Sequence, residues 1–272
     1  MRDMIVNGVK FDWGKKTYIM GILNRTPDSF SDGGRYAGME EALSHVSEMI
    51  SEGADIIDIG GESTRPGFAP VDVDEEIDRV VPLIKAVSQK YNVPISVDTW
   101  HAKTAEAALD AGAHIINDIW GLKADPEMAG VAARHEAPVC IMHNKKLPEY
   151  ENLLEDVLKD LEQSIELAVK SGIKKENIII DPGIGFGKTY EHNIRIMGNL
   201  ELFRNLGFPV LLGISRKSMI GLTLELPVDK RLEGSIAANV IGIIKGVDII
   251  RVHDVEQNRR AAVMTDKITR QF

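Results

Sequence analysis

The sequence predicts an α/β protein built as a (β/α)8 TIM barrel, and three observations lead to this prediction. Eight short apolar runs rich in β-branched residues each precede a segment whose apolar residues have helical spacing. Strands that alternate with helices form right-handed parallel βαβ units, and eight such units close into a barrel. The 272 residues are close to the roughly 250 that one such barrel needs. We therefore expect a single domain over residues 1–272.

The first predicted element is an N-terminal β-hairpin over residues 4–17. Apolar and polar residues alternate there around Asn7-Gly8. This dipeptide favours a two-residue type I′ turn because both of its residues accept a positive φ. We expect the hairpin to plug the closed end of the barrel.

The barrel elements follow in order along the chain. The predicted strands are residues 18–23, 56–59, 95–97, 115–116, 139–142, 178–180, 210–212 and 249–252. The predicted helices are residues 40–52, 74–91, 103–111, 126–136, 153–171, 190–206, 231–245 and 255–267. Most helices are followed by a glycine of the kind that ends helices, namely Gly53, Gly112, Gly172, Gly207 and Gly246.

Polar residues stand where the predicted strands end, and in a barrel of this type those positions form the catalytic mouth. They are Asn24, Glu62, Asp98, Asn117, Asp118, His143, Asp181, Ser215, Arg216, Lys217, Arg251 and His253. The sequence thus predicts an enzyme with its active site at the carboxyl ends of the strands.

Composition excludes several classes of protein. The formal net charge of −9 and the pI near 5.3 argue against nucleic-acid binding, which needs a broad basic face. The sequence shows neither the layout of a signal peptide nor an apolar run near the ~20 residues of a membrane span, so we expect a cytoplasmic protein with no membrane partner. The single cysteine, Cys140, lies in an apolar strand run and is expected to be a packed, inert thiol.

Two predicted loops are long or rich in glycine. Residues 20–34 read MGILNRTPDSFSDGG and residues 60–67 read GGESTRPG. Long polar loops after barrel strands are often functional lids, although an ordinary surface loop is the alternative. Ser63 and Thr64 could donate hydrogen bonds to phosphate oxygens. The guanidinium of Arg65 could bind a carboxylate or phosphate through two parallel hydrogen bonds, and the alternative is that it is a solvent-exposed charge.

The last strands bring cations to the mouth. Residues 181–188 read DPGIGFGK, a glycine-rich turn before a helix, which is weak evidence for an anion site. Ser215, Arg216, Lys217, Arg251 and His253 follow the seventh and eighth strands, where such barrels often bind phosphate. Clustered like charges need a counter-ion, so we expect an anionic ligand, with salt bridges to neighbouring helices as the alternative for one or two of these residues.

Acidic residues and an amide balance these cations. Asp98, Asp181 and Asn117 end apolar strands, and together they could recognise a planar heterocycle with a row of donors, such as a pterin or guanine. Capping of the following helix is the competing role for each of these aspartates and for Asp118.

With these motifs in place, the chain resembles the dihydropteroate synthase family, the pterin-binding TIM barrels of the folate pathway that sulfonamides inhibit. The resemblance runs from Met20 to about Val255. Its motifs, in family order, are MGILNxTPDSFSDGG, DIGGESTRPG, SVDT, IINDI, MHN, DPGIGFGK, GISRKS and IRVHD. It implies an SN1-like condensation of 6-hydroxymethyl-7,8-dihydropterin pyrophosphate with p-aminobenzoate that gives 7,8-dihydropteroate and pyrophosphate, with Mg²⁺ as cofactor. The family is typically a homodimer through its last helices, and residues 236–244 contain apolar side chains that could serve, although core packing explains them equally well.

The resemblance also assigns roles to residues by motif. It implies catalytic roles for Asp98, Asp181, Lys217 and Arg251, and metal contact for Asn24. Asn117, Met142 and Phe186 complete its pterin pocket, and Thr64 and His253 join Arg251 at the pyrophosphate. Its p-aminobenzoate site falls on Phe30, Ser63, Thr64, Arg65, Pro66, Lys217 and either Ser215 or Ser218.

Two alternatives stay open at this point. Pterin-dependent methyltransferases share the barrel but have no use for a loop that grips p-aminobenzoate, so Arg65 argues against them. A non-catalytic pterin-binding homologue is the other alternative, because Arg25 replaces the valine that is commoner in the family. The chain also lacks the glycine-rich turn that many members have at residues 143–150.

Overall fold

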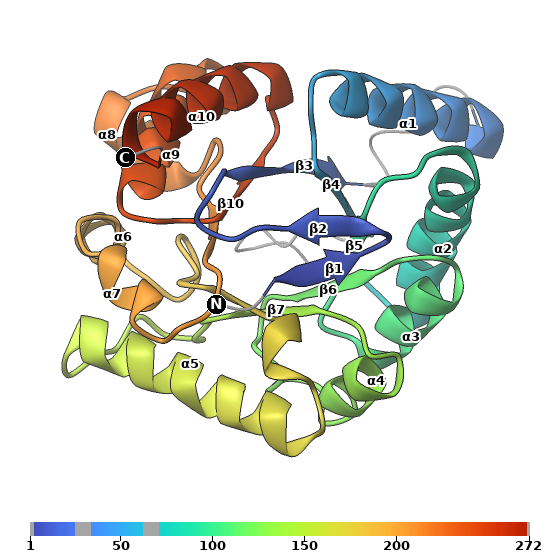
Figure 1. The fold of residues 1–272 in the computed structure, drawn as a ribbon, viewed down its shortest axis with the longest axis horizontal. Coiled ribbons are helices and arrows are strands. Elements are labelled where there is room, and N and C mark those ends of the chain that lie inside the picture. The colour runs from blue at the N-terminus through green and yellow to red at the C-terminus, as the bar shows by residue number, and fades with distance from the viewer. Residues whose placement is uncertain (1–2, 25–33, 62–70, 271–272) are drawn as a thin grey trace.

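The structure is a computed structural model that describes residues 3–24, 34–61 and 71–270, with residues 34–37 described by their backbone alone. Eight parallel strands form one sheet in the order β8-β7-β6-β5-β4-β3-β10-β9, and a parallel bridge between Ile180 and Val210 joins its two edges. The helices lie around this ring (Figure 1). The predicted (β/α)8 barrel is confirmed.

The strands agree with the prediction to within one or two residues. They are β3 (Tyr18–Asn24), β4 (Ile56–Gly60), β5 (Ile95–Asp98), β6 (Ile115–Asp118), β7 (Val139–Met142), β8 (Ile178–Asp181), β9 (Leu211–Gly213) and β10 (Ile249–Val252). Their burial is nearly continuous, as expected for a parallel sheet that is covered on both faces.

The helices largely follow the predicted apolar spacing. They are α1 (Gly34–Ser51), α2 (Val73–Lys90), α3 (Ala102–Asp110), α4 (Met128–Arg134), α5 (Leu153–Lys170), α6 (Tyr190–Met197), α7 (Glu201–Arg204), α8 (Ser218–Leu224), α9 (Leu232–Ile244) and α10 (Val255–Thr269), with 3-10 turns η2 (Lys175–Asn177) and η3 (Val228–Lys230). The five predicted helix-ending glycines all have positive φ, between 82° and 109°. Within the described residues, no helix is both long and apolar enough to cross a membrane.

Three helix predictions were wrong in detail. The predicted helix over residues 190–206 is broken into α6 and α7, because Gly198 caps the first helix and the next amide, that of Asn199, turns to the carbonyl of Ile196. Helix α1 was predicted to begin at residue 40 but begins at Gly34. The first turns contain Gly34 and Gly38, which interrupt the apolar spacing that predicts a helix. Helix α8 was not predicted, because seven residues are too few for a periodic pattern to stand out.

The N-terminal hairpin is confirmed, with β1 (Met4–Val6) antiparallel to β2 (Val9–Phe11). Asn7 and Gly8 have φ of 47° and 72°, as a type I′ turn requires. Met4, Val6 and Phe11 pack in one cluster with residues that begin the strands, including Tyr18 and Ile56. The hairpin lies across the barrel in Figure 1 and thereby closes its amino-terminal end. Cys140 belongs to the same cluster, where burial raises the pKa of its thiol, so the prediction of an inert thiol holds.

Candidate active site

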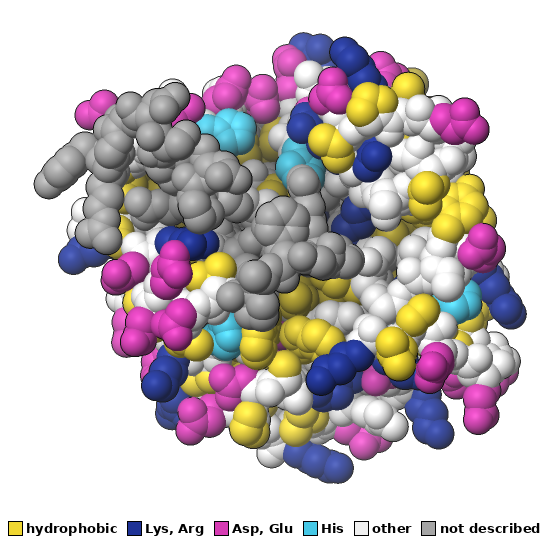
Figure 2. Space-filling model, turned by 180° about the vertical axis from the view of Figure 1, so that it is seen from behind, with side chains coloured by type: hydrophobic (Ala, Val, Ile, Leu, Met, Phe, Trp, Pro, Cys, Tyr) yellow, Lys and Arg dark blue, Asp and Glu magenta, His cyan; other side chains and the backbone are white. Residues whose placement is uncertain are grey.

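A cavity of about 450 Å³ lies at the carboxyl ends of the strands, on the side opposite the hairpin. Figure 2 shows this face, where basic, histidine and apolar side chains lie around the centre. The described residues that line the cavity are Ile22, Asn24, Gly185, Phe186, Gly213, Ser215, Arg216, Lys217, Ser218, Val228, Arg231, Arg251 and His253. Seven of the predicted site residues are among them: Asn24, Phe186, Ser215, Lys217, Ser218, Arg251 and His253.

Arg251 stands at the centre of the site between two buried carboxylates. Its Nε donates to Asp58 Oδ2 at 2.6 Å and one terminal nitrogen donates to Asp98 Oδ2 at 2.7 Å. The amide of Asn117 also lies 3.4 Å from Asp58 Oδ2. These residues come from distant parts of the chain and meet because their strands lie side by side in the sheet, in the order β10, β3, β4, β5 and β6.

Sequence reasoning missed Asp58. The signal was present, because an aspartate inside the apolar run 56–59 is costly to bury unless it has a partner. Its partner, Arg251, is 193 residues away in sequence, and only the closure of the barrel reveals the pair.

Burial perturbs Asp98 strongly. Its carboxyl is 2% exposed, and burial, reinforced by the charge of Asp58 and opposed by Arg251, raises the pKa of Asp98 to about 7. Among the described residues, Oδ1 of Asp98 and Oδ1 of Asp58 have no hydrogen-bond partner although both are buried. Buried acceptors are rarely left unpaired in a finished structure, so these two oxygens mark places where a ligand with donor groups would be stabilised.

Lys217 and Asp181 form the second charged part of the site. Burial lowers the pKa of Lys217 to about 8 and raises the pKa of Asp181, against the opposing charge of Lys217. The Lys217 ammonium donates to the carbonyl of Ile184 and lies 4.5 Å from the centre of the Phe186 ring. Asp181 Oδ1 accepts from the amide of Gly183 at 2.7 Å.

Met142 and Asp118 end neighbouring strands but differ in role. Met142 is 3% exposed, consistent with an apolar wall. The carboxylate of Asp118 accepts from the amides of Trp120 and Leu122 at 2.8 and 2.7 Å. The capping alternative for Asp118 is therefore the one that the structure shows, and burial raises the pKa of Asp118 to about 6.

The cations of the last two strands have counter-ions inside the protein. Arg216 pairs with Asp254 through Nε at 3.0 Å and through a second, shorter contact, and Arg251 pairs with Asp58 and Asp98. For these two arginines the structure therefore shows salt bridges, the alternative to an external anion, although the carboxylates come from β4, β5 and the loop after β10 and not from neighbouring helices as expected. Ser215 Oγ lies 3.1 Å from His253 Nδ1 and accepts from the His253 amide.

The DPGIGFGK turn also differs from the anion site that its pattern suggested. The three glycines have positive φ; Gly183 and Gly187 allow the turn to approach the chain after β7 closely, and Gly185 faces the side chain of Lys217. Lys188 does not line the cavity among the described residues. Its ammonium donates instead to carbonyl groups of the turn itself.

Several predicted site residues lie outside the described residues. They are Phe30, Ser63, Thr64, Arg65 and Pro66, together with Arg25 and Glu62. The predicted p-aminobenzoate site is therefore described here only through Ser215, Lys217 and Ser218.

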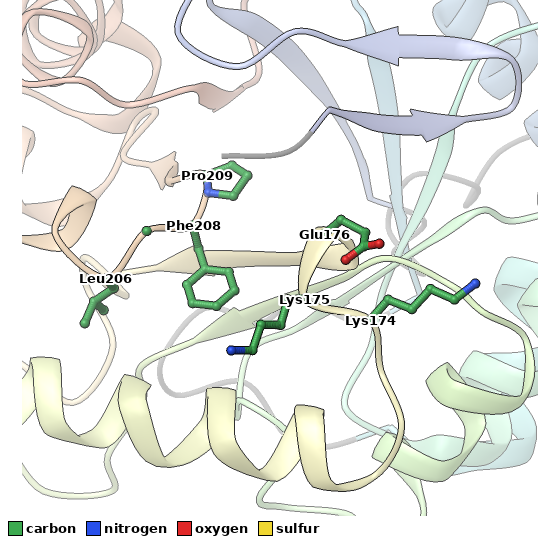
Figure 3. A pocket seen from close by; sticks show the side chains of 7 residues that line it. Lys174, Lys175, Glu176, Leu206, Phe208 and Pro209 are labelled. Atoms are coloured by element: carbon green, nitrogen blue, oxygen red, sulfur yellow. The ribbon is translucent and has the colours of Figure 1, made fainter.

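A larger hollow, of about 620 Å³, lies at the opposite end of the barrel, before β8 and β9. It is lined by Lys174, Lys175, Glu176, Leu206, Gly207, Phe208 and Pro209. Figure 3 shows Lys174 and Lys175 pointing away from each other, and Lys174 is paired with Glu136. This end of a barrel normally serves stability rather than chemistry, so we assign the site to the smaller cavity.

Comparisons with known proteins agree with this assignment. A family described as "pterin binding enzyme" matches residues 20–253. The dihydropteroate synthase of Clostridium beijerinckii is 58% identical over 98% of this chain and 100% of its own length, and that of Bacillus subtilis is 56% identical over 93% and 88%.

Solved structures give the same result. The dihydropteroate synthase of Clostridium difficile in the presence of pteroic acid superposes with a TM-score of 0.94 and 53% identity, over 96% of this chain and 100% of that one. The Yersinia pestis enzyme in complex with a sulfonamide drug superposes with a TM-score of 0.91 and 41% identity, over 98% of both chains. The barrel, the charged cavity and these matches together place the chain in the family of pterin-binding enzymes.

Proposed function

We propose that this protein is a dihydropteroate synthase, a transferase of folate biosynthesis. It joins 6-hydroxymethyl-7,8-dihydropterin pyrophosphate to p-aminobenzoate and releases pyrophosphate. One observation carries the proposal: Asp98, Asp181, Lys217 and Arg251, from four different strand ends, converge at the mouth of the barrel. Relatives that match nearly the whole chain carry this name. The similar Yersinia pestis enzyme was solved with a sulfonamide drug, which supports this protein as a sulfonamide target.

Recognition of the pterin follows from the acceptors of the site. Asp98, Asp181 and the amide of Asn117 present acceptors that suit the donor-rich edge of a pterin. Met142 and Phe186 serve as apolar walls. A carboxyl with a pKa near 7, such as Asp98, can hold a proton or give it up at neutral pH, so it adapts to either protonation state of the ring.

The chemical step separates charge. The bond between the pterin methylene carbon and the pyrophosphate oxygen breaks, the electron pair leaves with the pyrophosphate, and the pterin becomes a cation. Asp98 and Asp181 stabilise this cation, while Arg251 and His253, with Thr64, hold the pyrophosphate. Arg251 pairs with both Asp58 and Asp98, so we propose that the pyrophosphate takes the place of Asp98 at Arg251, while Asp58 keeps the arginine oriented and Asp98 turns to the pterin.

The amine of p-aminobenzoate then attacks the methylene carbon and loses a proton, so no protein nucleophile is needed. We assign its binding to Phe30, Ser63, Thr64, Arg65, Pro66, Ser215, Lys217 and Ser218. Lys217 lies where the pterin and p-aminobenzoate meet in this arrangement, and a cation there can attract the carboxylate of the second substrate.

Asn24 is the residue we assign to Mg²⁺. It ends β3 and lines the cavity, and an amide oxygen is a donor that Mg²⁺ accepts. Among the described residues, no group of three or more His, Cys, Asp or Glu side chains is arranged to hold a metal, so the pyrophosphate and water would supply the other ligands. Mg²⁺ bound there would neutralise charge on the leaving group.

The decisive experiment follows pyrophosphate release from dihydropterin pyrophosphate with Mg²⁺, with and without p-aminobenzoate. Release that depends on p-aminobenzoate and yields dihydropteroate is the expected result. Binding of the pterin substrate with no product would contradict the proposal and identify either a non-catalytic pterin-binding protein or a pterin-dependent methyltransferase.

We also propose a cytoplasmic homodimer formed through α9 and α10. These neighbouring helices carry exposed apolar side chains, namely Ile241, Ile244, Val263, Met264 and Ile268, which are 47% to 62% exposed. Exposed apolar patches of this kind often mark an interface, and a second copy offers the same patch by two-fold symmetry. Light scattering after size exclusion should give twice the chain mass, and Ile268→Glu should give the mass of one chain. A wild-type protein of single-chain mass would refute the dimer.

A further inference from the structure

Lys188, the last residue of the DPGIGFGK motif, has an ammonium surrounded by acceptors. Its Nζ lies 2.7 Å from His143 Nδ1, 2.8 Å from the carbonyl oxygen of Gly183 and 2.9 Å from that of Phe186. Gly183 and Phe186 belong to the turn after β8, whereas His143 directly follows β7. The side chain therefore connects the ends of two neighbouring strands.

These three acceptors, all within 2.9 Å, match the three N–H groups of an ammonium ion. A fourth acceptor, the carbonyl oxygen of His143, lies farther away, at 3.4 Å. Burial, together with the charge of Lys188, lowers the pKa of His143 to about 2, so its ring is neutral and Nδ1 can accept a hydrogen bond. Burial also lowers the pKa of Lys188 to about 7, but hydrogen bonds to three acceptors favour the charged form. A neutral amine, with two N–H groups, would leave one acceptor unpaired.

The turn held by Lys188 touches both charged parts of the pterin site. The amide of Gly183 donates to Asp181, and the carbonyl of Ile184 accepts from the ammonium of Lys217. The ring of Phe186 lies beside the same ammonium. A shift of the turn would thus move an acceptor of the site, a cation and an apolar wall together.

The turn packs closely against the chain after β7 and is also held by Tyr150, whose hydroxyl donates to the carbonyl of Gly187, and by Asn193, which accepts from the amide of Gly185. At Gly183 a Cβ atom would overlap the carbonyl oxygen of His143, and at Gly187 it would overlap the carbonyl of Lys145. Glycine is flexible by itself, so three glycines in five residues need external contacts to hold one conformation. Lys188 adds contacts to the carbonyls of Gly183 and Phe186 in the turn and joins them to His143 at the end of the neighbouring strand.

We infer that Lys188 is a positioning residue for the pterin substrate: its ammonium holds the turn over residues 183–187 against the end of β7 and so fixes Asp181, Lys217 and Phe186. It acts through these residues and does not touch the substrate. This inference rests on the proposed function, because it names the pterin as the molecule whose binding the turn controls.

The test replaces Lys188 with methionine, which has a similar length and no donor. We expect Lys188→Met to raise KM for dihydropterin pyrophosphate at least tenfold and to raise KM for p-aminobenzoate by a clearly smaller factor, because of the three residues that the turn fixes only Lys217 also serves the second substrate. If Lys188 served only the packing of the protein, Lys188→Met would lower the yield of folded protein but would not raise the KM of one substrate more than that of the other. An unchanged KM for the pterin substrate in a folded variant would overturn the inference.

Lys146→Met is the matched control. Lys146 is exposed and also follows β7, so this change removes one positive charge from the same region and leaves the contacts of the turn in place. We expect both KM values of this variant to stay within twofold of wild type. An equal rise of the pterin KM in both variants would mean that charge, not positioning, is responsible, and would overturn the inference.

A second variant keeps the test decisive if Lys188→Met does not fold. Lys188→Ala leaves space for a small amine, and added propylammonium should restore pterin affinity where propanol, of similar size, does not. Recovery with both compounds, or with neither, would overturn the inference.

Pteroate binding, measured by calorimetry on wild type and variants, separates this inference from the proposed function. If wild type binds pteroate but makes no dihydropteroate, the proposed function fails, and the effect of Lys188→Met on pteroate affinity still decides the inference. An affinity at least tenfold weaker supports it, and an unchanged affinity refutes it.

Discussion

Asp98→Asn should gain stability relative to wild type as the pH rises through about 7, and it should abolish catalysis. The carboxyl of Asp98 is 2% exposed and has two unequal oxygens, one bound to Arg251 and one without a partner among the described residues. Asparagine keeps the shape and removes the charge whose burial is unfavourable. Sites of function often carry such a cost in stability.

The magnitude follows from the pKa of Asp98, which rises from an ordinary 3.8 to about 7 in the folded protein. The raised pKa means that the folded state binds the proton of Asp98 more tightly than the unfolded state does. This tighter binding contributes fully to the free energy of unfolding below about pH 4, and the contribution is lost as the pH rises through about 7. At about 1.4 kcal/mol per pKa unit, the ionised carboxylate costs about 4 kcal/mol above pH 7. About 2 to 3 kcal/mol of that cost arises between pH 5 and pH 8.

The assay is urea unfolding of wild type and Asp98→Asn at about pH 5 and about pH 8. The stability of the variant relative to wild type should increase by about 2 to 3 kcal/mol between these two pH values. Comparing the two proteins at each pH cancels the titration of groups that both contain, such as Asp118 and Lys188. At about pH 8, where Asp98 of the wild type is ionised, turnover of the variant should be lost, because the cation has lost its counter-charge.

Glu136→Gln is the control. Glu136 is exposed, and its hydrogen bond with Lys174 lowers the pKa of Glu136, so this carboxylate is ionised in both states at pH 5 and at pH 8. The stability of this variant relative to wild type should not change between the two pH values. If Asp98→Asn behaves in the same way, or loses stability relative to wild type as the pH rises, the assignment of a buried, unfavourably charged Asp98 is refuted.

Three further predictions concern the site and its scaffold. Asp58→Asn should lower kcat/KM between tenfold and a hundredfold, because the charge-assisted bond that orients Arg251 is worth about 1.5 to 3 kcal/mol; steady-state kinetics with an unchanged kcat/KM would show that Asp58 does not orient the arginine. Gly183→Ala should lower the free energy of unfolding by about 3 kcal/mol or more, since both the φ of +70° and the carbonyl of His143 disfavour a side chain. Gly207→Ala, with a φ of +82° but open space around the new Cβ atom, should lower it by only about 1 kcal/mol. Equal losses for the two variants in urea unfolding would contradict the close contact at Gly183. Chelation of divalent metal by EDTA should stop pyrophosphate release, and added Mg²⁺ should restore it; full turnover in EDTA would exclude the role assigned to Asn24.

Much of the fold was predictable from the sequence because its determinants are local. The alternation of apolar strands and helices gave all eight barrel strands to within two residues. The conformation of the hairpin turn depends on Asn7 and Gly8 alone, and the ends of five helices depend on glycines with positive φ. The position of the site was predictable for the same reason, since the carboxyl ends of parallel strands share one edge.

The sequence alone could not assign partners to the buried charges. Arg251 and Asp58 are 193 residues apart and meet only because β10 pairs with β3 and β3 pairs with β4. Lys188 was predicted within a possible anion site but turns toward His143 instead, because the path of the turn depends on how closely it packs against the end of β7. A side chain's type limits what it can bind, but the elements packed around it decide which partner it finds, and that arrangement exists only in the tertiary structure.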